Sequence, residues 1–187
     1  TRFYDAGTKD TAFPIPVREG YTFLGWSAEN GVKYSAYTPD MPAKLKLTAA
    51  WKYNKAGEIN VTFRLIGATR SSRDIDFSRE PGDSEYITWM ATRGYALSEG
   101  NTVYDLFVKA LEDAGLSSEG QDKNYVKTIT APKSLGGYDL SEFTNGVYSG
   151  WMYTIDGKHP GQGVRQQALE NGDKGIFHYV NDYRYEV

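Results

Sequence analysis

The sequence predicts an α+β fold in which strands dominate, arranged as two parts in tandem. The chain is rich in aromatic residues, with 15 Tyr, 8 Phe and 4 Trp in 187 residues, and such side chains favour pleated, half-buried surfaces. Short stretches of alternating apolar and polar residues recur between turn residues, which is typical of half-buried strands. A helical period occurs at residues 102–115. We therefore expect a first part that is nearly all β, and a second part with a mixed sheet covered by that helix.

The first part spans residues 1–52 and reads as short strands separated by turns. Pro14 and Pro16 place their segment at a sheet edge, because proline has no N–H to donate to a ladder. Gly25 interrupts a strand and predicts a bulge that turns Phe23 and Trp26 to the same side. We expect strands at residues 2–4, 13–17, 18–26, 31–34 and 45–51.

Two motifs in this part resemble a known repeat. Residues 18–26 read Arg-Glu-Gly-Tyr-Thr-Phe-Leu-Gly-Trp, and Met41-Pro42-Ala43 leads into the strand-like residues 45–52. Together they resemble the Listeria–Bacteroides repeat, the internalin B-repeat type, although the opening at residues 3–7 is shorter. The resemblance implies a small β-grasp-like module of extracellular, multi-repeat bacterial surface proteins, and the family has no catalytic residues.

Residues 53–58 are polar and are expected to form a linker to the second part, which is organised around residues 146–158. On that strand Trp151, Tyr153 and Ile155 face one side, because side chains alternate with period two. Asp156-Gly157 then supplies the positive φ of a tight turn. A face this aromatic predicts a sheet packed on one side.

The helix at residues 102–115 is the natural cover for that face. Thr102 is a good N-cap, Asp105 three residues later completes a variant of the capping box, and Gly115 is a good stop. Its apolar stripe consists of Val103, Leu106, Phe107, Ala110, Leu111 and Ala114.

The remaining segments complete a sheet around the helix. Residues 67–84 predict a loop or loose hairpin, residues 131–145 an irregular crossing, and residues 183–187 look strand-like. Further strands are expected at residues 59–66, 86–90, 95–97, 125–130 and 175–180, with a break at Arg93-Gly94. One helix between strand pairs, with the last strand returning to the sheet, is the β-grasp arrangement.

Four motifs of residues 59–187 resemble a bacterial surface family related to the transcobalamin C-terminal domain, also a β-grasp. The motifs are residues 99–107, 135–138, 149–157 and 169–173. In transcobalamins the related domain closes over the corrin ring, so the resemblance implies cobalamin capture as an alternative function. The cobalamin carriers also use a large α-helical domain, for which this sequence has no counterpart.

The aromatic residues are the best candidates for ligand binding. They are Tyr148, Trp151, Tyr153 and Trp89, as a platform for a sugar, a peptide or a corrin face, although we favour core packing for them. His159 in a loop is a candidate lone ligand for cobalt or another metal, whereas His178 in a strand is interpreted as a packed or edge histidine. We assign no metal site and no catalytic residue.

Other site classes find little support. The acidic segments 74–76 and 139–142 offer oxygens to calcium, but neither matches the twelve-residue calcium loop. The chain has no cysteine, which excludes disulfides and thiol catalysis. A net charge of −3 with dispersed basic residues argues against a nucleic-acid partner. No apolar run approaches the ~18 residues of a membrane span.

The expected function is that of a non-catalytic module pair from a bacterial cell-surface or secreted protein, for adhesion, ligand binding or spacing. Its partner would be an extracellular protein, a glycan or a small ligand. We expect the chain to be extracellular or cell wall-associated, as a piece of a longer polypeptide. The alternatives are a cobalamin module using Trp151, Tyr153 and His159, a glycan-binding or hydrolase accessory module, and a glycan hydrolase, which needs two carboxylates facing each other across a cleft.

Overall fold

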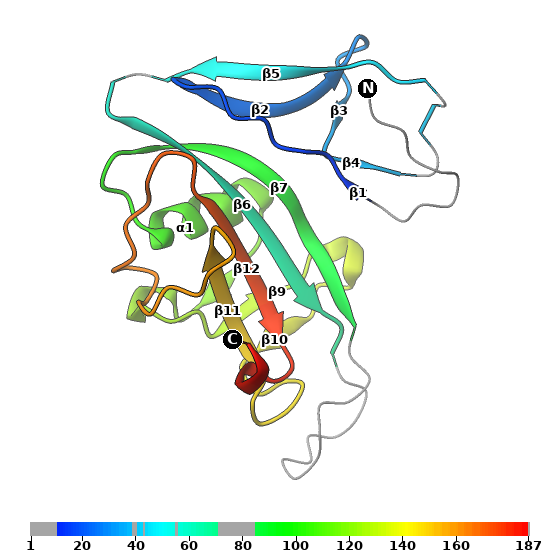
Figure 1. The fold of residues 1–187 in the computed structure, drawn as a ribbon. Coiled ribbons are helices and arrows are strands. Elements are labelled where there is room, and N and C mark those ends of the chain that lie inside the picture. Colours follow the sequence, from blue (N-terminus) through cyan, green and yellow to red (C-terminus); the bar gives the residue numbers. More distant parts are fainter. Residues whose placement is uncertain (1–10, 39–40, 43, 55, 71–84, 187) are drawn as a thin grey trace.

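The computed structural model describes residues 11–38, 41–42, 44–54, 56–70 and 85–186 (Figure 1). Strands dominate these residues, and the single α-helix among them packs on the largest of four sheets. The fold is therefore α+β and mostly β, as predicted. The strand expected at residues 2–4 and the acidic segment 74–76 lie outside the described residues.

The first part is built on an antiparallel three-stranded sheet. Its central strand is β2 (Tyr21–Ala28), between β3 (Lys33–Tyr34) and β5 (Leu47–Tyr53). A short pair, β1 (Thr11–Ala12) with β4 (Ala36–Tyr37), completes this part. The strands predicted at 31–34 and 45–51 thus exist with shifted ends.

The bulge predicted at Gly25 is confirmed. The register of β2 against β5 shifts between Phe23 and Gly25, and Gly25 has a φ of 120°. Phe23 then lies on the same side as Trp26, with ring centroids 5.5 Å apart. The predicted strand at 13–17 is wrong, because the prolines cannot donate; that segment is held instead by Trp26 Nε1, which donates to the Pro14 carbonyl over 2.9 Å.

The second part is built on a four-stranded mixed sheet. β6 (Glu58–Ala68) and β12 (Lys174–Val180) are parallel and lie in the centre. β7 (Tyr86–Ser98) pairs antiparallel with β6 on one side, and β11 (Gly150–Ile155) pairs antiparallel with β12 on the other. The strand within residues 146–158 is therefore an edge strand. Its Asp156-Gly157 turn is confirmed, with φ of 50° and 77°.

The prediction of two strands broken at Arg93-Gly94 is wrong, because β7 runs through both residues. Arg93 pairs with Phe63 and Gly94 with Thr62, and irregular registers on either side of Leu65 absorb the surplus residues. Glycine is needed at position 94 for a different reason: a Cβ there would collide with the carbonyl oxygen of Phe23 in the first part. The signal that looked like a strand break marks a close approach of two backbones.

The helix α1 (Val103–Ala114) covers one face of this sheet, as predicted. The Thr102 N–H donates to Asp105 Oδ2 over 2.7 Å, and Gly115 ends the helix with a φ of 65°. Its buried residues are Val103, Leu106, Phe107, Ala110 and Leu111. Ala114 does not continue the stripe; it is exposed, together with Glu112 and Asp113.

The core lies between α1 and the sheet. Phe107 on the helix contacts Phe177 on β12, with ring centroids 4.6 Å apart, and Phe177 stacks on Tyr153 of β11. Strand β6 shows the alternation clearly, since Ile59, Val61, Phe63 and Leu65 are buried in this core. The residues between them, from Asn60 to Ile66, point to the opposite face, which we call the outer face.

A small antiparallel sheet closes one end of the core. It consists of β8 (Ser118–Glu119), β9 (Thr128–Thr130) and β10 (Asp139–Ser141), with the short 3-10 helices η1 (Gln121–Lys123) and η2 (Lys133–Leu135) between them. The strand predicted at 125–130 is thus shorter, and the crossing at 131–145 contains a strand. Ile129 and Leu140 are fully buried there.

The last described residues, up to Glu186, form a turn and not a strand. The Asp182 carboxylate accepts from the Arg184 N–H over 3.0 Å and begins the 3-10 helix η3 (Tyr183–Tyr185). The strand-like appearance of residues 183–187 is therefore misleading, because a capping aspartate precedes them. This turn brings Glu186 back to the outer face of the sheet, beside β12.

The two parts meet where β2 crosses β6 and β7 (Figure 1). The Thr22 side chain is 1% exposed; its hydroxyl donates to Asn54 Oδ1 over 2.8 Å and also contacts Asn60 Oδ1. Asn60 Nδ2 donates to the Tyr21 carbonyl over 2.6 Å. We call these contacts, together with the close approach at Gly94, the junction. Division into domains near residues 53–58 stays a prediction.

Candidate functional site

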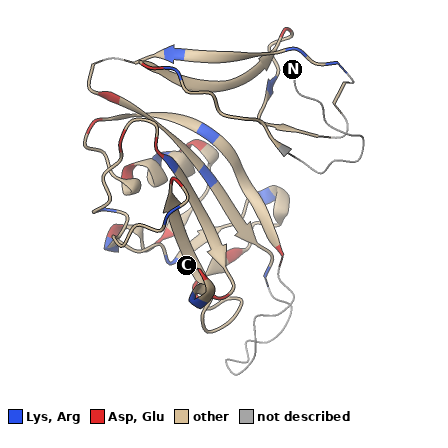
Figure 2. Cartoon of the chain, in the orientation of Figure 1, with Lys and Arg blue, Asp and Glu red and all other residues tan. Residues whose placement is uncertain are grey.

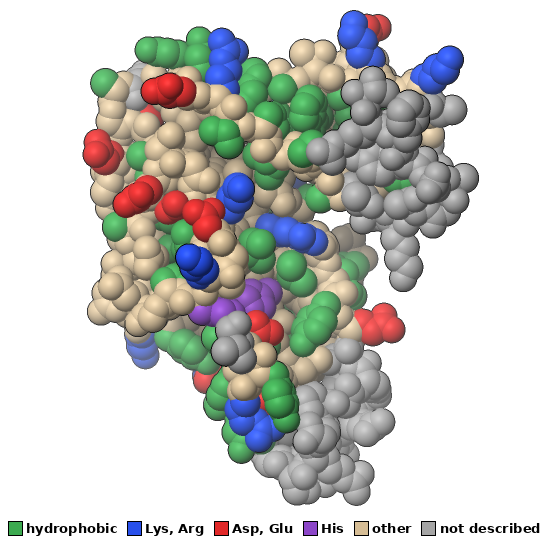
Figure 3. Space-filling model, viewed as in Figure 1, with side chains coloured by type: hydrophobic (Ala, Val, Ile, Leu, Met, Phe, Trp, Pro, Cys, Tyr) green, Lys and Arg blue, Asp and Glu red, His purple; other side chains and the backbone are tan. Residues whose placement is uncertain are grey.

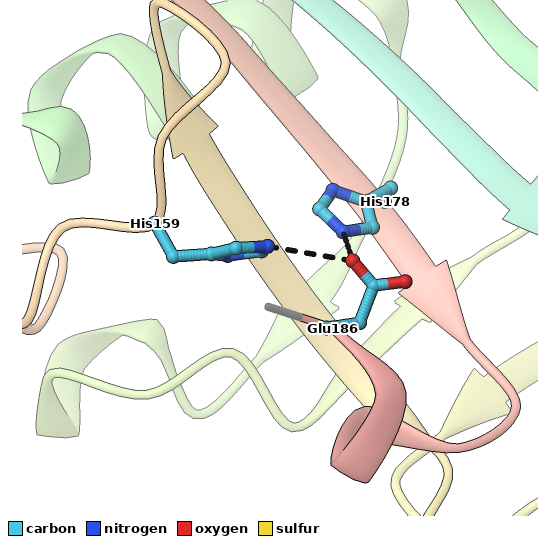
Figure 4. A group of neighbouring side chains, drawn as sticks. All are labelled: His159, His178 and Glu186. Carbon is cyan, nitrogen blue, oxygen red and sulfur yellow. Dashed lines mark hydrogen bonds and ion pairs between the residues drawn. The ribbon is translucent and has the colours of Figure 1, made fainter.

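Both histidines of the chain lie on the outer face of the four-stranded sheet. His178 is on β12, between the buried Phe177 and Tyr179, so the strand alternation turns it away from the core. His159 comes from the loop that follows the turn after β11, and Glu186 follows η3. These three side chains, which we call the His-His-Glu cluster, point toward one another (Figure 4). In the space-filling view the two imidazoles form one continuous patch (Figure 3).

One carboxylate oxygen is the meeting point of the cluster. Glu186 Oε2 lies 3.2 Å from His178 Nε2 and 3.4 Å from His159 Nε2. One nitrogen or oxygen atom from each side chain lies within 4.8 Å of the other two. The side chains are 15% exposed for His178, 26% for His159 and 33% for Glu186. The cluster is thus partly shielded but open to solvent on one side.

Backbone contacts orient the two imidazoles. His159 Nδ1 lies 3.0 Å from the Tyr153 carbonyl oxygen, so this nitrogen carries the proton and donates, and Nε2 is left toward Glu186. His178 also hydrogen-bonds to the backbone of Ile176. Burial lowers the pKa of His178; the Glu186 carboxylate opposes this shift without cancelling it. His178 is therefore neutral at pH 7, with a nitrogen lone pair able to bind a proton or a metal ion.

Two of the four predicted aromatic residues belong to the core. Trp151 is 5% exposed and Trp89 7%, and their rings contact each other with centroids 5.4 Å apart. Trp151 Nε1 donates to the Leu140 carbonyl over 2.8 Å, so its polar atom is satisfied inside the protein. This burial favours the packing interpretation of both tryptophans over a ligand platform.

The other two aromatic residues lie apart from each other. Tyr153 stacks on Phe177 on the helix side of the sheet, and its hydroxyl donates to the Gln162 carbonyl over 2.5 Å. Tyr148 is 36% exposed and lies beneath the Arg184 guanidinium, 3.7 Å from its ring centroid. His159 lies on the outer face. The residues proposed for a shared ligand surface are therefore distributed over both faces of the sheet.

The acidic segment at 139–142 makes local hydrogen bonds. Asp139 Oδ1 accepts from the Thr130 hydroxyl over 2.7 Å, and Glu142 Oε2 accepts from the Tyr125 hydroxyl over 3.0 Å. Burial, together with this contact to Glu142, raises the pKa of Tyr125 to about 12. These carboxylates act as structural acceptors within the described residues.

A cleft of about 480 Å³ lies between the two parts of the chain. Lys33 lines it from the first part, and Arg64 and Thr88 line it from the outer face of the second part. Arg64 Nη2 donates to the Thr88 hydroxyl over 3.0 Å, which holds the guanidinium against the sheet.

Elsewhere, basic and acidic residues are interspersed over both parts (Figure 2). In the described part of the chain, no helix has the length and apolar character that a bilayer crossing needs.

Sequence reasoning identified His159 as a lone candidate ligand but missed its two partners. His178 does lie in a strand, as predicted, but it faces the outer surface beside His159. Glu186 belongs to residues 183–187, for which the sequence predicts a strand. The one signal in the sequence is the alternation of Phe177, His178 and Tyr179 along the strand. If the two aromatic residues face the core, His178 must lie on the other face of the sheet.

Comparison with known protein families gives a match to part of the chain. Residues 100–181, less than half of the chain, match the model of a family described as a domain of unknown function, DUF4430. The matched range contains α1, both histidines and the whole of β11 and β12. This match does not extend to the first part, so the repeat resemblance there stays a prediction. No curated protein and no solved structure matches the chain.

Proposed function

We propose that this chain is a non-catalytic pair of modules from a bacterial cell-surface or secreted protein, in which the first module holds the second at a fixed orientation for adhesion or ligand presentation. The second module would be a β-grasp domain of the type related to the transcobalamin C-terminal domain. A hairpin, a helix and a second hairpin, with the first and last strands parallel in the centre, support that assignment. The match to the family of unknown function is compatible with it.

For the first module we propose the Listeria–Bacteroides repeat type. The support comes from the packing of its motif residues. The bulge at Gly25 places Phe23 against Trp26 and Trp51, with ring centroids 5.5 and 5.4 Å apart, so the aromatic residues of the motif form the centre of this small sheet. A module this small gains much of its stability from such an aromatic cluster.

The junction is the observation that carries the proposal. Independent modules on a flexible tether would expose polar side chains to water where they touch. Here Thr22 and Asn54 are 1% and 7% exposed; the Thr22 hydroxyl donates to Asn54, and Asn60 Nδ2 of the second module donates to the Tyr21 carbonyl of the first over 2.6 Å. Each such buried bond contributes about 1 kcal/mol, and leaving its groups unpaired costs more. The modules are thereby held in one orientation, which suits a spacer or a presenting arm.

The cleft between the modules is the surface we assign to the partner. Lys33 and Arg64 give its walls positive charge, and the remaining described lining is small, polar or apolar, without a carboxylate. Such a lining suits an acidic glycan or an acidic protein segment. It offers no support for a glycan hydrolase, which needs paired carboxylates across the substrate.

An array of glycans and extracellular proteins, probed with the whole chain, tests this function. We expect saturable binding to an acidic glycan or protein that weakens as salt is raised, with the ligand recovered unchanged. A matched pair of variants assigns the surface: Arg64→Ala should weaken binding, and the exposed Lys158→Ala outside the cleft should not. Time-dependent cleavage of the bound glycan or protein would contradict the non-catalytic role.

Cobalamin binding by Trp151, Tyr153 and His159 has less support. Trp151 is buried, Tyr153 packs on the helix side of the sheet, and His159 lies on the outer face. The three side chains therefore do not share a surface to which a corrin ring could bind. A cobalamin titration followed by absorbance distinguishes the two functions, because the presenting role predicts no spectral change.

A further inference from the structure

We propose that His159, His178 and Glu186 form a binding site for a divalent transition-metal ion, with Zn²⁺ as the best match. Two imidazole nitrogens and one carboxylate oxygen are a known ligand set for zinc, with a fourth position left for water or a ligand from a partner. The site is separate from the cleft between the modules, and it does not depend on the proposed presenting role.

The distances within the cluster fit such an ion. Zinc bonds of ~2.0–2.1 Å in a tetrahedral arrangement place neighbouring ligand atoms about 3.3–3.4 Å apart. The two distances from Glu186 Oε2 to the histidine Nε2 atoms are 3.2 and 3.4 Å. All three ligand atoms lie within 4.8 Å of one another, so the two histidine nitrogens would have to approach by about 1.4 Å at most to close the third edge.

The second contact of each imidazole supports a metal role. A zinc-bound histidine usually donates its other ring N–H to a carbonyl or carboxylate, which fixes the tautomer and the ring orientation. His159 has this contact, because Nδ1 faces the Tyr153 carbonyl oxygen at 3.0 Å. His178 also has a backbone hydrogen bond, to Ile176. The Nε2 atoms of both rings lie beside the same carboxylate oxygen, Glu186 Oε2.

A simple hydrogen-bonded cluster accounts for the geometry less well. In the absence of an ion, His178 Nε2–H can donate to Glu186 Oε2 over 3.2 Å, so the contact that needs explanation is the one made by His159. In the tautomer that carries its proton on Nδ1 and donates it to the backbone, His159 has no proton on Nε2 to give to Glu186. Its lone pair then faces a carboxylate oxygen at 3.4 Å, a repulsive contact that a cation between the two atoms makes favourable.

The site joins three segments that are distant in sequence. His159 belongs to the loop after the β11 turn, His178 to a central strand, and Glu186 to the end of the turn that follows β12. A bound ion would fix that loop and the last turn against the outer face of the sheet. Because the ion binds the folded arrangement only, it should raise the thermal stability of the whole chain by mass action.

The test uses the whole chain without a histidine tag, freed of metal with a chelator, and Zn²⁺ as the probe. The chain has two histidines, so a ¹H–¹⁵N spectrum of the imidazoles contains signals from two rings. We expect one equivalent of Zn²⁺ to shift both rings together and to raise the melting temperature. Substitution of Co²⁺ should give the intense visible bands of a tetrahedral ion.

Variants locate the site. His159→Gln, His178→Gln and Glu186→Gln should each weaken Zn²⁺ binding at least ~10-fold in calorimetric titration. Glu112→Gln, a matched change at an exposed glutamate of α1, should leave the affinity unchanged. The Glu186 side chain is 33% exposed, so its variant is expected to fold, and circular dichroism of each variant without metal checks this.

The proposal fails if millimolar Zn²⁺ leaves both imidazole spectra unchanged. It also fails if Zn²⁺ binds the Glu186→Gln variant as tightly as the wild type, because binding would then lie elsewhere. The imidazole spectrum of the wild-type protein decides the question even if a histidine variant does not fold.

Discussion

Replacing Phe107 by alanine tests the packing of α1 on the sheet. The ring is fully buried and contacts Phe63 and Phe177, with centroids 6.3 and 4.6 Å away. Removing such a side chain forfeits its transfer free energy and leaves a cavity, at a typical cost of 3–5 kcal/mol. A domain of this size has roughly 5–15 kcal/mol in total. The variant should therefore lose about a fifth or more of its free energy of unfolding.

Urea unfolding measures this loss directly. Trp89 and Trp151 lie in the same core, so their fluorescence reports the transition, and circular dichroism should give the same midpoint. Lys109→Ala on the exposed side of α1 is the control and should change stability by less than about 0.5 kcal/mol. A loss below about 1 kcal/mol for Phe107→Ala would refute the packing of this helix against β12.

Three further predictions concern single contacts. Asp105→Ala removes the acceptor of the Thr102 N–H at the start of α1, and should cost about 1 kcal/mol in urea unfolding; no change would mean that the cap contributes nothing. Burial lowers the pKa of His178, so in metal-free buffer the contribution of this side chain to stability is complete above the unfolded-state pKa of about 6.5 and is lost as pH falls through the folded-state pKa. The His178→Gln variant should therefore show a flatter fall of melting temperature on acidification than the wild type. An equally steep fall in both proteins would count against this assignment. The pKa of Tyr125 is raised to about 12 by partial burial and its contact with Glu142, so its contribution to stability is present below pH ~10 and disappears as pH rises through the folded-state value. Ultraviolet titration of the wild type minus Tyr125→Phe should show a phenol ionising near pH 12, and one ionising near 10 would contradict the contact with Glu142.

The elements that could be predicted carry local signals. The helix is marked by Thr102, Asp105 and Gly115 within one continuous period, and the turn after β11 by the pair Asp156-Gly157. In both cases the residues that determine the conformation are adjacent in sequence, so no tertiary information is needed.

The elements that could not be predicted depend on distant contacts. Gly94 looks like a strand break in the sequence, but its lack of a side chain allows Phe23, 71 residues earlier in the chain, to approach the backbone of β7. The His-His-Glu cluster has the same origin. Parallel pairing of β6 with β12 sets the position of His178, and only the turn begun at Asp182 brings Glu186 to it. No spacing in the sequence reveals such an encounter.

The fixed orientation of the two modules is the central claim, and the distance between labels on the two modules tests it most directly. Because the chain has no cysteine, Glu29→Cys on the first module and Glu112→Cys on α1 can carry one spin label each. We expect a single narrow distance distribution by pulsed electron resonance. Gly94→Ala should widen or shift it, whereas Gly161→Ala, where an added Cβ meets open space, should not. A broad distribution in the otherwise unaltered chain would show that the modules move independently, and would contradict the account.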